Sequence, residues 1–164
     1  MNDLSKFTIQ LATKADVPII LNFIRGLAKY EKLSHEVKAT EAQLRKHLFG
    51  SKPAAEVIIA KLDRAPVGFA LFFTTFSTFA GRRGIWLEDL FVLPQNRRAG
   101  IGRALLRAVA AIALRRKCGR LEWSVLDWNE PAIKLYRKLG AKSMDDWTIQ
   151  RVTGKALANL AGKS

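Results

Sequence analysis

Hydrophobic and polar residues follow two different periods in the first part of the chain. The segment Lys6 to Leu11 alternates between apolar and polar side chains, which predicts a half-buried strand. Apolar residues then recur at helical spacing as far as Tyr30, and again over a shorter stretch that ends near Gly50. Both stretches follow a Thr with an Asp or Gln three residues later, at Thr13 and Thr40, a signature of helix starts. The first part therefore predicts a strand followed by two helices.

The middle of the chain contains three apolar runs rich in β-forming residues. They occupy residues 57–60, 67–75 and 85–93, and the turn at residues 63–66 predicts a hairpin between the first two. An uncharged stretch of 17 residues, 65–81, is short for a membrane span and contains Pro, Gly and four Ser or Thr residues. We therefore interpret it as part of a buried sheet.

Helical periodicity returns after Gly100 and is followed by a short predicted strand at residues 121–126. Asn129 then predicts the start of another helix, which Gly140 ends. A last strand is predicted near residues 148–152, before a tail rich in Ala and Lys. This order of elements predicts a mixed sheet with helices on both sides, and parallel pairing where a helix returns the chain.

Composition and charge narrow the class of protein. A length of 164 residues fits one domain, and 28 Lys and Arg residues against 14 Asp and Glu residues give a net charge of +14, which attracts anions. The chain has one cysteine, Cys118, which excludes an intramolecular disulfide and is given no catalytic role. One cysteine and two histidines leave few side chains to form a zinc site. Because the N-terminus does not read as a signal peptide, we expect a cytoplasmic protein.

A glycine-containing segment, Arg97 to Arg103, lies between a predicted strand and a predicted helix. Its two glycines allow a tight turn, and the free N–H groups at a helix start can bind a pyrophosphate. The spacing matches neither a Walker motif nor the full dinucleotide motif. An ordinary turn beside a solvated basic face explains the same residues, so this segment alone does not decide the function.

Three further residues carry side chains that acid–base chemistry uses. Glu88 and Asp89 interrupt an apolar strand, and strict alternation places them on opposite faces of the sheet. Because an unpaired buried carboxylate is costly, each is either functional or part of a structural ion pair or sheet end. Tyr136 lies on the apolar side of its helix, where its hydroxyl serves as an acid or simply lies at the edge of the core.

Taken together, three segments resemble the acetyl-CoA motifs of the GNAT N-acetyltransferase superfamily. They are Leu87–Val92, Arg97–Gly102 and Trp128–Tyr136, and the resemblance extends along nearly the whole chain. With Leu27–Glu31, the pattern is similar to the branch that contains the spermidine/spermine and thialysine N-acetyltransferases. The resemblance implies a single acetyltransferase domain over residues 1–164, with a mixed, mostly antiparallel α/β (α+β) sheet covered by helices on both faces.

The resemblance also implies an activity: transfer of the acetyl group of acetyl-CoA to a primary amine of a diamine, polyamine or lysine-like amino acid, without a metal. Glu88 matches the base that acts through water, and Tyr136 matches the general acid. The implied cofactor-binding residues are Leu90, Phe91, Val92, Arg97, Arg98, Ala99, Gly100, Ile101, Gly102, Arg103, Asn129, Glu130, Pro131, Ala132 and Leu139. The implied substrate-binding residues are Tyr30, Glu31, Glu88, Glu122, Trp123 and Ser124; a local cluster of Glu31, Glu88 and Glu122 is expected to hold one ammonium group despite the positive net charge.

Two other functions remain open at this stage. The basic composition fits a nucleic-acid-binding module, although the chain lacks a helix-turn-helix or RNA-recognition signature. A GNAT domain that binds acyl-CoA without catalysis is the second alternative. We expect a small-molecule amine as the partner, no membrane and no nucleic acid. We also expect a homodimer, with the C-terminal strand and the tail from Thr153 exchanged between subunits.

Overall fold

The computed structural model describes residues 7–163, which form two compact units. The first unit extends to Leu126 and the second begins at Asp127. The strands, all in the first unit, are β1 (Phe7–Leu11), β2 (Glu56–Leu62), β3 (Ala65–Ser77), β4 (Arg82–Val92) and β5 (Leu121–Trp123). The helices of the first unit are α1 (Val17–Tyr30), α2 (Glu41–Phe49) and α3 (Ile101–Arg115), with short 3-10 turns at Lys14–Asp16, Ser34–Glu36 and Pro94–Asn96; those of the second unit are α4 (Glu130–Lys138) and α5 (Gly154–Leu160).

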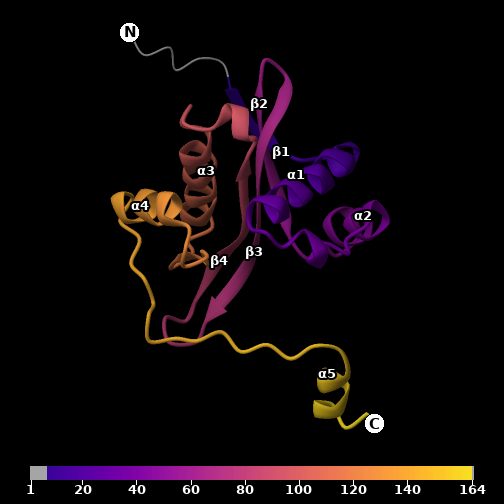
Figure 1. The fold of residues 1–164 in the computed structure, drawn as a ribbon. Coiled ribbons are helices and arrows are strands. Elements are labelled where there is room, and N and C mark those ends of the chain that lie inside the picture. The colour runs from indigo at the N-terminus through magenta and orange to yellow at the C-terminus, as the bar shows by residue number, and fades with distance from the viewer. Residues whose placement is uncertain (1–6, 164) are drawn as a thin grey trace. The chain divides into compact units, whose positions relative to one another are not determined.

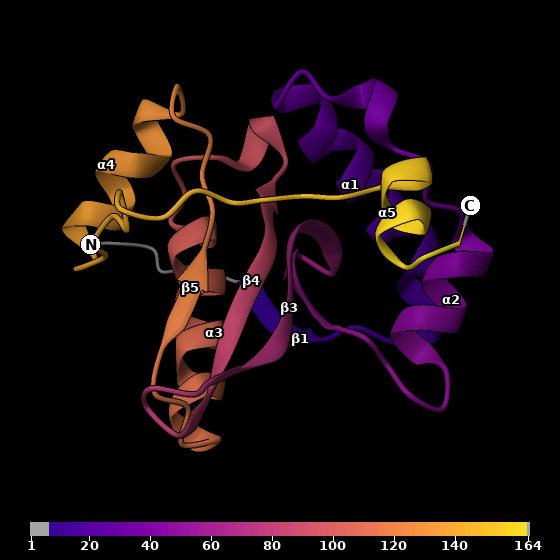
Figure 2. The same ribbon diagram turned by 90° about the horizontal axis from the view of Figure 1, so that it is seen from below.

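The first unit is built on a five-stranded sheet in the order β1-β2-β3-β4-β5. Figure 1 labels β1 to β4 of this sheet. The pairs from β1 to β4 are antiparallel, whereas β4 and β5 are parallel. Figure 2 shows β4 and β5 side by side, and α3 is the helix that connects them along the chain. The expected mixed, mostly antiparallel sheet is confirmed, with its parallel pair where a helix returns the chain.

The hairpin between β2 and β3 is tighter than the sequence predicts. Leu62 pairs directly with Ala65, so only Asp63 and Arg64 form the turn. Their φ angles are 48° and 69°, and two positive φ values are required at the centre of a type I′ turn. This turn matches the twist of the two strands and fixes their register at this end.

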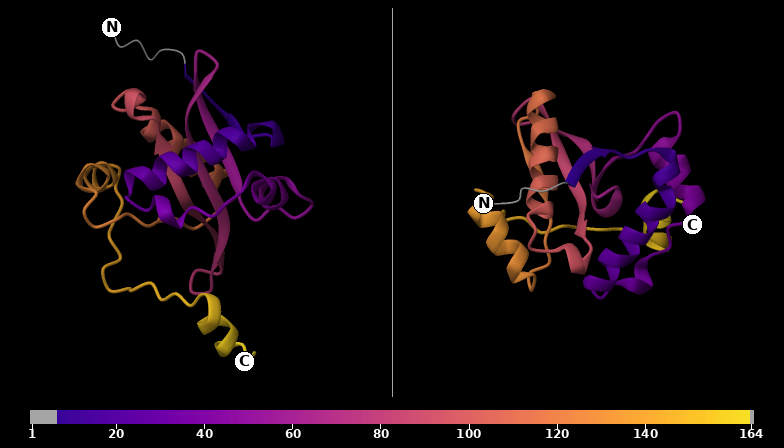
Figure 3. Two further views of the ribbon diagram at one scale, coloured as in Figure 1. Left: turned by 45° about the vertical axis from the view of Figure 1, so that its right-hand side comes forward. Right: turned by 90° about the horizontal axis from the view of Figure 1, so that it is seen from above.

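Helices cover both faces of the sheet, as expected: α1 and α2 lie on one face and α3 on the other (Figures 1 and 3). On the first side, called the α1 face below, Phe23 of α1 stacks on Phe69 with ring centroids 5.5 Å apart. A Cβ atom on Gly26 would lie 2.7 Å from Cζ of Phe91, so the Phe91 ring of β4 packs directly against α1 at this glycine. This contact brings the end of α1 to β4.

Helix starts in the first unit agree with the sequence signatures. Thr40 Oγ1 accepts a hydrogen bond from the Gln43 N–H, and the Gln43 side chain accepts one from the Thr40 N–H, which is a capping box. At the 3-10 turn that precedes α1, the N–H and the hydroxyl of Thr13 both donate to Oδ2 of Asp16, at 2.7 and 2.8 Å. Within the described residues, no helix is long and apolar enough to cross a membrane.

The second unit contains the predicted helix but not the predicted strand. α4 begins after Asn129, and Gly140 follows its end with a φ of 91°. The strand predicted at residues 148–152 is wrong: these residues have no regular structure, and the chain ends instead in α5. Alternating apolar residues make a strand only when another strand supplies backbone partners, and the described residues provide none here. β5 is also shorter than predicted: it stops at Trp123 rather than at residue 126, although β4 continues to Val92.

Candidate active site

A β-bulge in β4 determines where the two adjacent acids lie. Leu71 of β3 pairs with Asp89, and the next residue, Phe72, pairs with Leu87, so Glu88 is an extra residue without a partner on β3. Because Leu71 packs with α1 residues, Asp89 lies on the α1 face, whereas Leu87 lies on the α3 side. Glu88 follows Leu87 and therefore also lies on the α1 face. The expectation that the two acids lie on opposite faces is wrong, because the bulge breaks the alternation.

A hydrogen bond supports this placement of Glu88. The indole Nε1 of Trp86 donates to Oε2 of Glu88 at 2.8 Å, which requires both side chains on the same face. Glu88 is exposed, whereas Asp89 is largely buried. Two carboxyl groups of different environment thus stand next to each other at the bulge.

A third carboxyl group, Glu31, completes a cluster that we call the acid cluster (Glu31, Glu88 and Asp89). Burial raises the pKa of Asp89 to about 7, with further contributions from the negative charges of Glu88 and Glu31. Burial also raises the pKa of Glu31, which follows the last residue of α1. Glu31 and Glu88 are among the predicted substrate-binding residues, whereas Asp89 is not. The signal was present in the two consecutive acids, and the assumption of a regular strand concealed it.

The other predicted substrate-binding residues are distributed around this cluster. Glu122 of β5 is the register partner of Trp86 and so lies on the α1 face, but its carboxylate is paired with Arg120, with Oε2 and Nε 2.7 Å apart. Trp123 pairs with Leu87 and therefore lies on the opposite face, and Ser124 follows the end of β5. Glu122 thus shares a face with Glu88, whereas Trp123 does not.

The predicted pyrophosphate segment forms the connection between β4 and α3. Arg98 and Gly100 have φ angles of 67° and 81°, and α3 begins directly after Gly100. At such a helix start the first N–H groups have no partner within the helix, so they are available to an anion. The residues present therefore fit a diphosphate, with further charge from the arginines around the turn.

Arg97 connects this segment to the end of α1. Its Nε donates to the carbonyl oxygen of Val92 at 3.1 Å, and its guanidinium carbon lies 4.5 Å from the ring centroid of Tyr30 and 5.7 Å from that of Phe91. Tyr30, a predicted substrate-binding residue, is therefore in contact with a predicted cofactor-binding residue. The structure brings these two residues together on the α1 face.

The outer edge of β4 is open beyond the bulge. Pairing with β5 ends at Leu87 and Trp123, whereas β4 continues to Val92. Within the described residues, the stretch 88–92 therefore has a strand neighbour on the β3 side only. Backbone N–H and C=O groups on such an edge need other partners, and an extended ligand is of a kind that fits such an edge. Leu90, Phe91 and Val92, predicted to bind the cofactor, lie in this stretch.

The remaining predicted residues belong to the second unit. Asn129 to Ala132 form the start of α4, and the backbone carbonyl of Tyr136 accepts hydrogen bonds from the N–H groups of Leu139 and Ala141. The roles predicted for Tyr136, Leu139 and the start of α4 stay predictions. Among the residues that the structure describes, no group of three or more His, Cys, Asp or Glu side chains is arranged to hold a metal ion.

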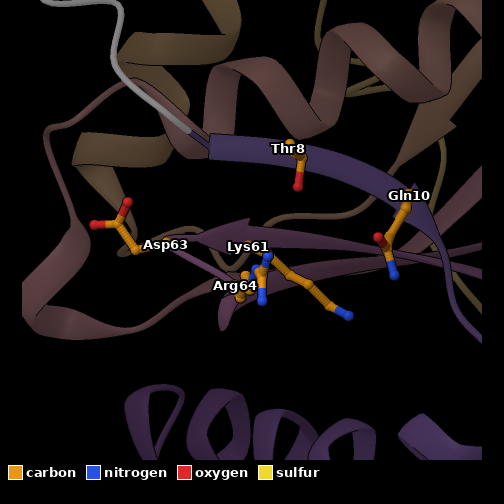
Figure 4. Close-up of a pocket in the computed structure, with 5 residues that line it drawn as sticks. All are labelled: Thr8, Gln10, Lys61, Asp63 and Arg64. Carbon is orange, nitrogen blue, oxygen red and sulfur yellow. The ribbon is translucent and has the colours of Figure 1, made fainter.

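A polar pocket at the other edge of the sheet is separate from the acid cluster. Thr8, Gln10, Lys61, Asp63 and Arg64 line it (Figure 4). These residues come from β1, β2 and the turn between β2 and β3, on the side of the sheet away from β4. The pocket contains no residue that either sequence or geometry points to as catalytic.

Comparisons with known proteins agree with the geometry of the first unit. The model of the acetyltransferase (GNAT) family matches residues 24–141. A thialysine N-epsilon-acetyltransferase from Mus musculus is 39% identical, over 94% of this chain and 97% of its own length. The L-ornithine N5-acetyltransferase NATA1 of Arabidopsis thaliana is 32% identical, over 91% of this chain and 85% of its own. Among solved structures, an integron cassette protein from V. cholerae superimposes with a TM-score of 0.80 at 26% identity, covering 96% of this chain and 98% of that one.

Proposed function

Because the chain belongs to the acetyltransferase (GNAT) family and is an N-acetyltransferase, we propose that it acetylates a primary amine of a small diamine, polyamine or lysine-like amino acid. Acetyl-CoA is the co-substrate of this family. The observation that carries the choice of acceptor is the acid cluster at the β4 bulge, beside the open strand edge. An acceptor with more than one ammonium group is attracted by several carboxylates, whatever the net charge of the whole surface.

The named activities of two relatives support this class of acceptor. One acetylates thialysine and the other L-ornithine, by their names. Both are amino acids with a terminal amine, so each presents an amine to be acetylated and a second amino group. We propose that Glu31 and Asp89 contact such cations. A bound ammonium favours the ionised form of Asp89, and its binding therefore lowers the pKa of that carboxyl from about 7.

Proton transfer is the step for which the chain supplies side chains. An alkyl ammonium group has a pKa of about 10 and must lose a proton before its nitrogen can attack. In the proposed reaction the nitrogen–carbon bond to the acetyl group forms, the carbon–sulfur bond breaks, and the proton of the amine passes through water to Glu88. Tyr136 donates a proton to the departing sulfur and is reprotonated by the second proton that the nitrogen loses on becoming an amide, and Glu88 returns its proton to water. Backbone N–H groups at the open edge of β4 stabilise the negative charge that develops on the carbonyl oxygen.

The test measures thiol release from acetyl-CoA with diamines, polyamines, lysine analogues and aminoglycosides as acceptors. We expect turnover with one amine class, and a loss of at least ~100-fold in kcat on Glu88→Gln or Tyr136→Phe, which is the usual contribution of a general base or acid. Glu41→Gln is the matched control, since Glu41 lies on α2 and pairs with Arg45. Binding of acetyl-CoA without turnover on any amine would instead indicate an acyl-CoA-binding domain without catalysis.

We also propose that the protein is a homodimer. The segment predicted as a strand, together with Trp147 just before it, exposes large apolar side chains: Trp147, Ile149 and Val152 are 75%, 70% and 44% accessible. A strand-like segment of this kind gains its hydrogen bonds by pairing with a sheet edge, and a second copy of the chain offers one. Light scattering at micromolar concentration is expected to give the dimer mass, and a monomer at that concentration contradicts the proposal.

A further inference from the structure

The Glu88 carboxylate is exposed at a bulge, yet one of its oxygens is held. The indole Nε1 of Trp86 donates to Oε2 at 2.8 Å. Trp86 itself is half-buried and fixed in the sheet, because it pairs with Phe73 of β3 on one side and Glu122 of β5 on the other. The fixed indole of Trp86 therefore determines the orientation of the Glu88 carboxylate, whose side chain is otherwise flexible.

We propose that Trp86 is a positioning residue for the acetyl-transfer reaction, which orients the Glu88 carboxylate through this hydrogen bond. The inference rests on the proposed function, since it assumes that Glu88 receives the proton of the amine. With Oε2 held by the indole, Oε1 is the oxygen that accepts the proton by way of water. A glutamate has three side-chain torsions, and fixing them removes conformations from which transfer is impossible.

The chemistry of the donor distinguishes Glu88 from Glu122 on the same face. The indole N–H is a donor only and carries no charge, so it orients a carboxylate without neutralising it and without competing for the proton. Glu122 is instead paired with the guanidinium of Arg120, which compensates its charge. Of the two carboxylates on either side of Trp86, Glu88 therefore keeps the negative charge that attracts and deprotonates an amine.

A double-mutant cycle separates this role from a structural one. Trp86→Phe keeps an aromatic side chain, although a smaller one, and removes the N–H group; we expect kcat to fall ~10-fold, as for the loss of a hydrogen bond to a charged group, with an unchanged KM for acetyl-CoA. In the Glu88→Gln background the same change is expected to alter the remaining rate less than ~2-fold. In the Glu122→Gln background the ~10-fold loss is expected to persist. Equal losses in all three backgrounds would show that Trp86 acts only on the stability of the sheet, and would overturn the proposal.

Nuclear magnetic resonance tests the contact independently of activity. The chain has four tryptophans, so its ¹⁵N spectrum contains four indole N–H signals, and Trp86→Phe identifies the one from Trp86. Glu88→Gln is expected to shift this signal and Glu122→Gln is not. A Trp86 signal that Glu88→Gln leaves in place overturns the inference.

The two proposals fail in different ways. If the unmodified enzyme turns over no amine, the proposed function fails and the role of Trp86 fails with it. If the unmodified enzyme turns over an amine but Trp86→Phe leaves kcat unchanged, only the role of Trp86 is overturned.

Discussion

Replacing Asp89 with asparagine is expected to stabilise the protein above neutral pH while it lowers activity. Asp89 is largely buried on the α1 face beside Glu88 and Glu31, and all three effects favour its protonated form. Asn has nearly the shape of a protonated Asp but never ionises. The substitution therefore removes a cost that the wild-type chain bears only when Asp89 is charged.

The size and sign of the effect follow from the pKa. The carboxyl has a pKa of about 7 in the folded protein and 3.8 ordinarily, so the folded state binds its proton more tightly than the unfolded state. The stabilising effect of the proton is complete below pH 3.8 and is lost as the pH rises to about 7. At about 1.4 kcal/mol per pH unit, the full cost is at most ~4 kcal/mol.

Urea denaturation of wild type and Asp89→Asn at pH 5 and pH 8 measures this cost. We expect the difference in unfolding free energy to favour the variant by ~1–3 kcal/mol more at pH 8 than at pH 5, after allowance for partial solvation. Asp145→Asn, at an exposed position of the second unit, is the control, and we expect its difference in unfolding free energy from wild type to be the same at pH 5 and pH 8. An Asp89→Asn difference that does not vary with pH would refute the assignment of Asp89 as a carboxyl held near neutrality by burial and its neighbours.

Three other substitutions test features of the first unit. Gly26→Ala places a Cβ atom 2.7 Å from Cζ of Phe91, and we expect a loss of ~1–3 kcal/mol in thermal unfolding measurements. Gly100→Ala puts a side chain at a φ of 81°, so we expect acetyl-CoA binding measured by calorimetry to weaken ~10-fold, with the acceptor amine affected less. Arg116→Ala removes the pairing of the two terminal guanidinium nitrogens with the Glu56 carboxylate, at 2.6 and 2.7 Å. In urea denaturation at pH 7 we expect the unfolding free energy to fall by ~0.5–1 kcal/mol. The loss is expected to be smaller below pH 4.5, because the pairing lowers the pKa of Glu56 and its ionised form disappears in acid.

Sequence reasoning located most elements because their signals are local. The capping boxes at Thr13 and Thr40, the glycine after α4 and the helical period after Gly100 depend on residues within a turn or two of each other. The bulge was not predictable in this way, since it is defined by how β4 pairs with β3 and not by the residues of β4 alone. Asp89 was missed for that reason.

The strand predicted at residues 148–152 failed for a different physical reason. Its alternation is genuine, but a strand forms only when hydrogen-bond partners come from elsewhere. The candidate site divides along the same line. The first unit contains Glu31, Glu88, Tyr30 and the Arg97 segment, and the structure brings them onto or next to the α1 face. Tyr136 belongs to the second unit. Its predicted role follows neither from the periodicity of its helix nor from the geometry of that unit.

The bulge has a consequence for how this chemistry can be gained or lost. Residues before Glu88 pair in register with β3, and so do the residues after it; Glu88 alone is outside the pairing. Deleting this one residue would therefore join two stretches that already fit their neighbour, and every other side chain of β4 would keep its face. The proposed proton acceptor is an insertion that the sheet can do without, so an ancestor or a designed variant with one residue fewer would retain the fold and lack the base.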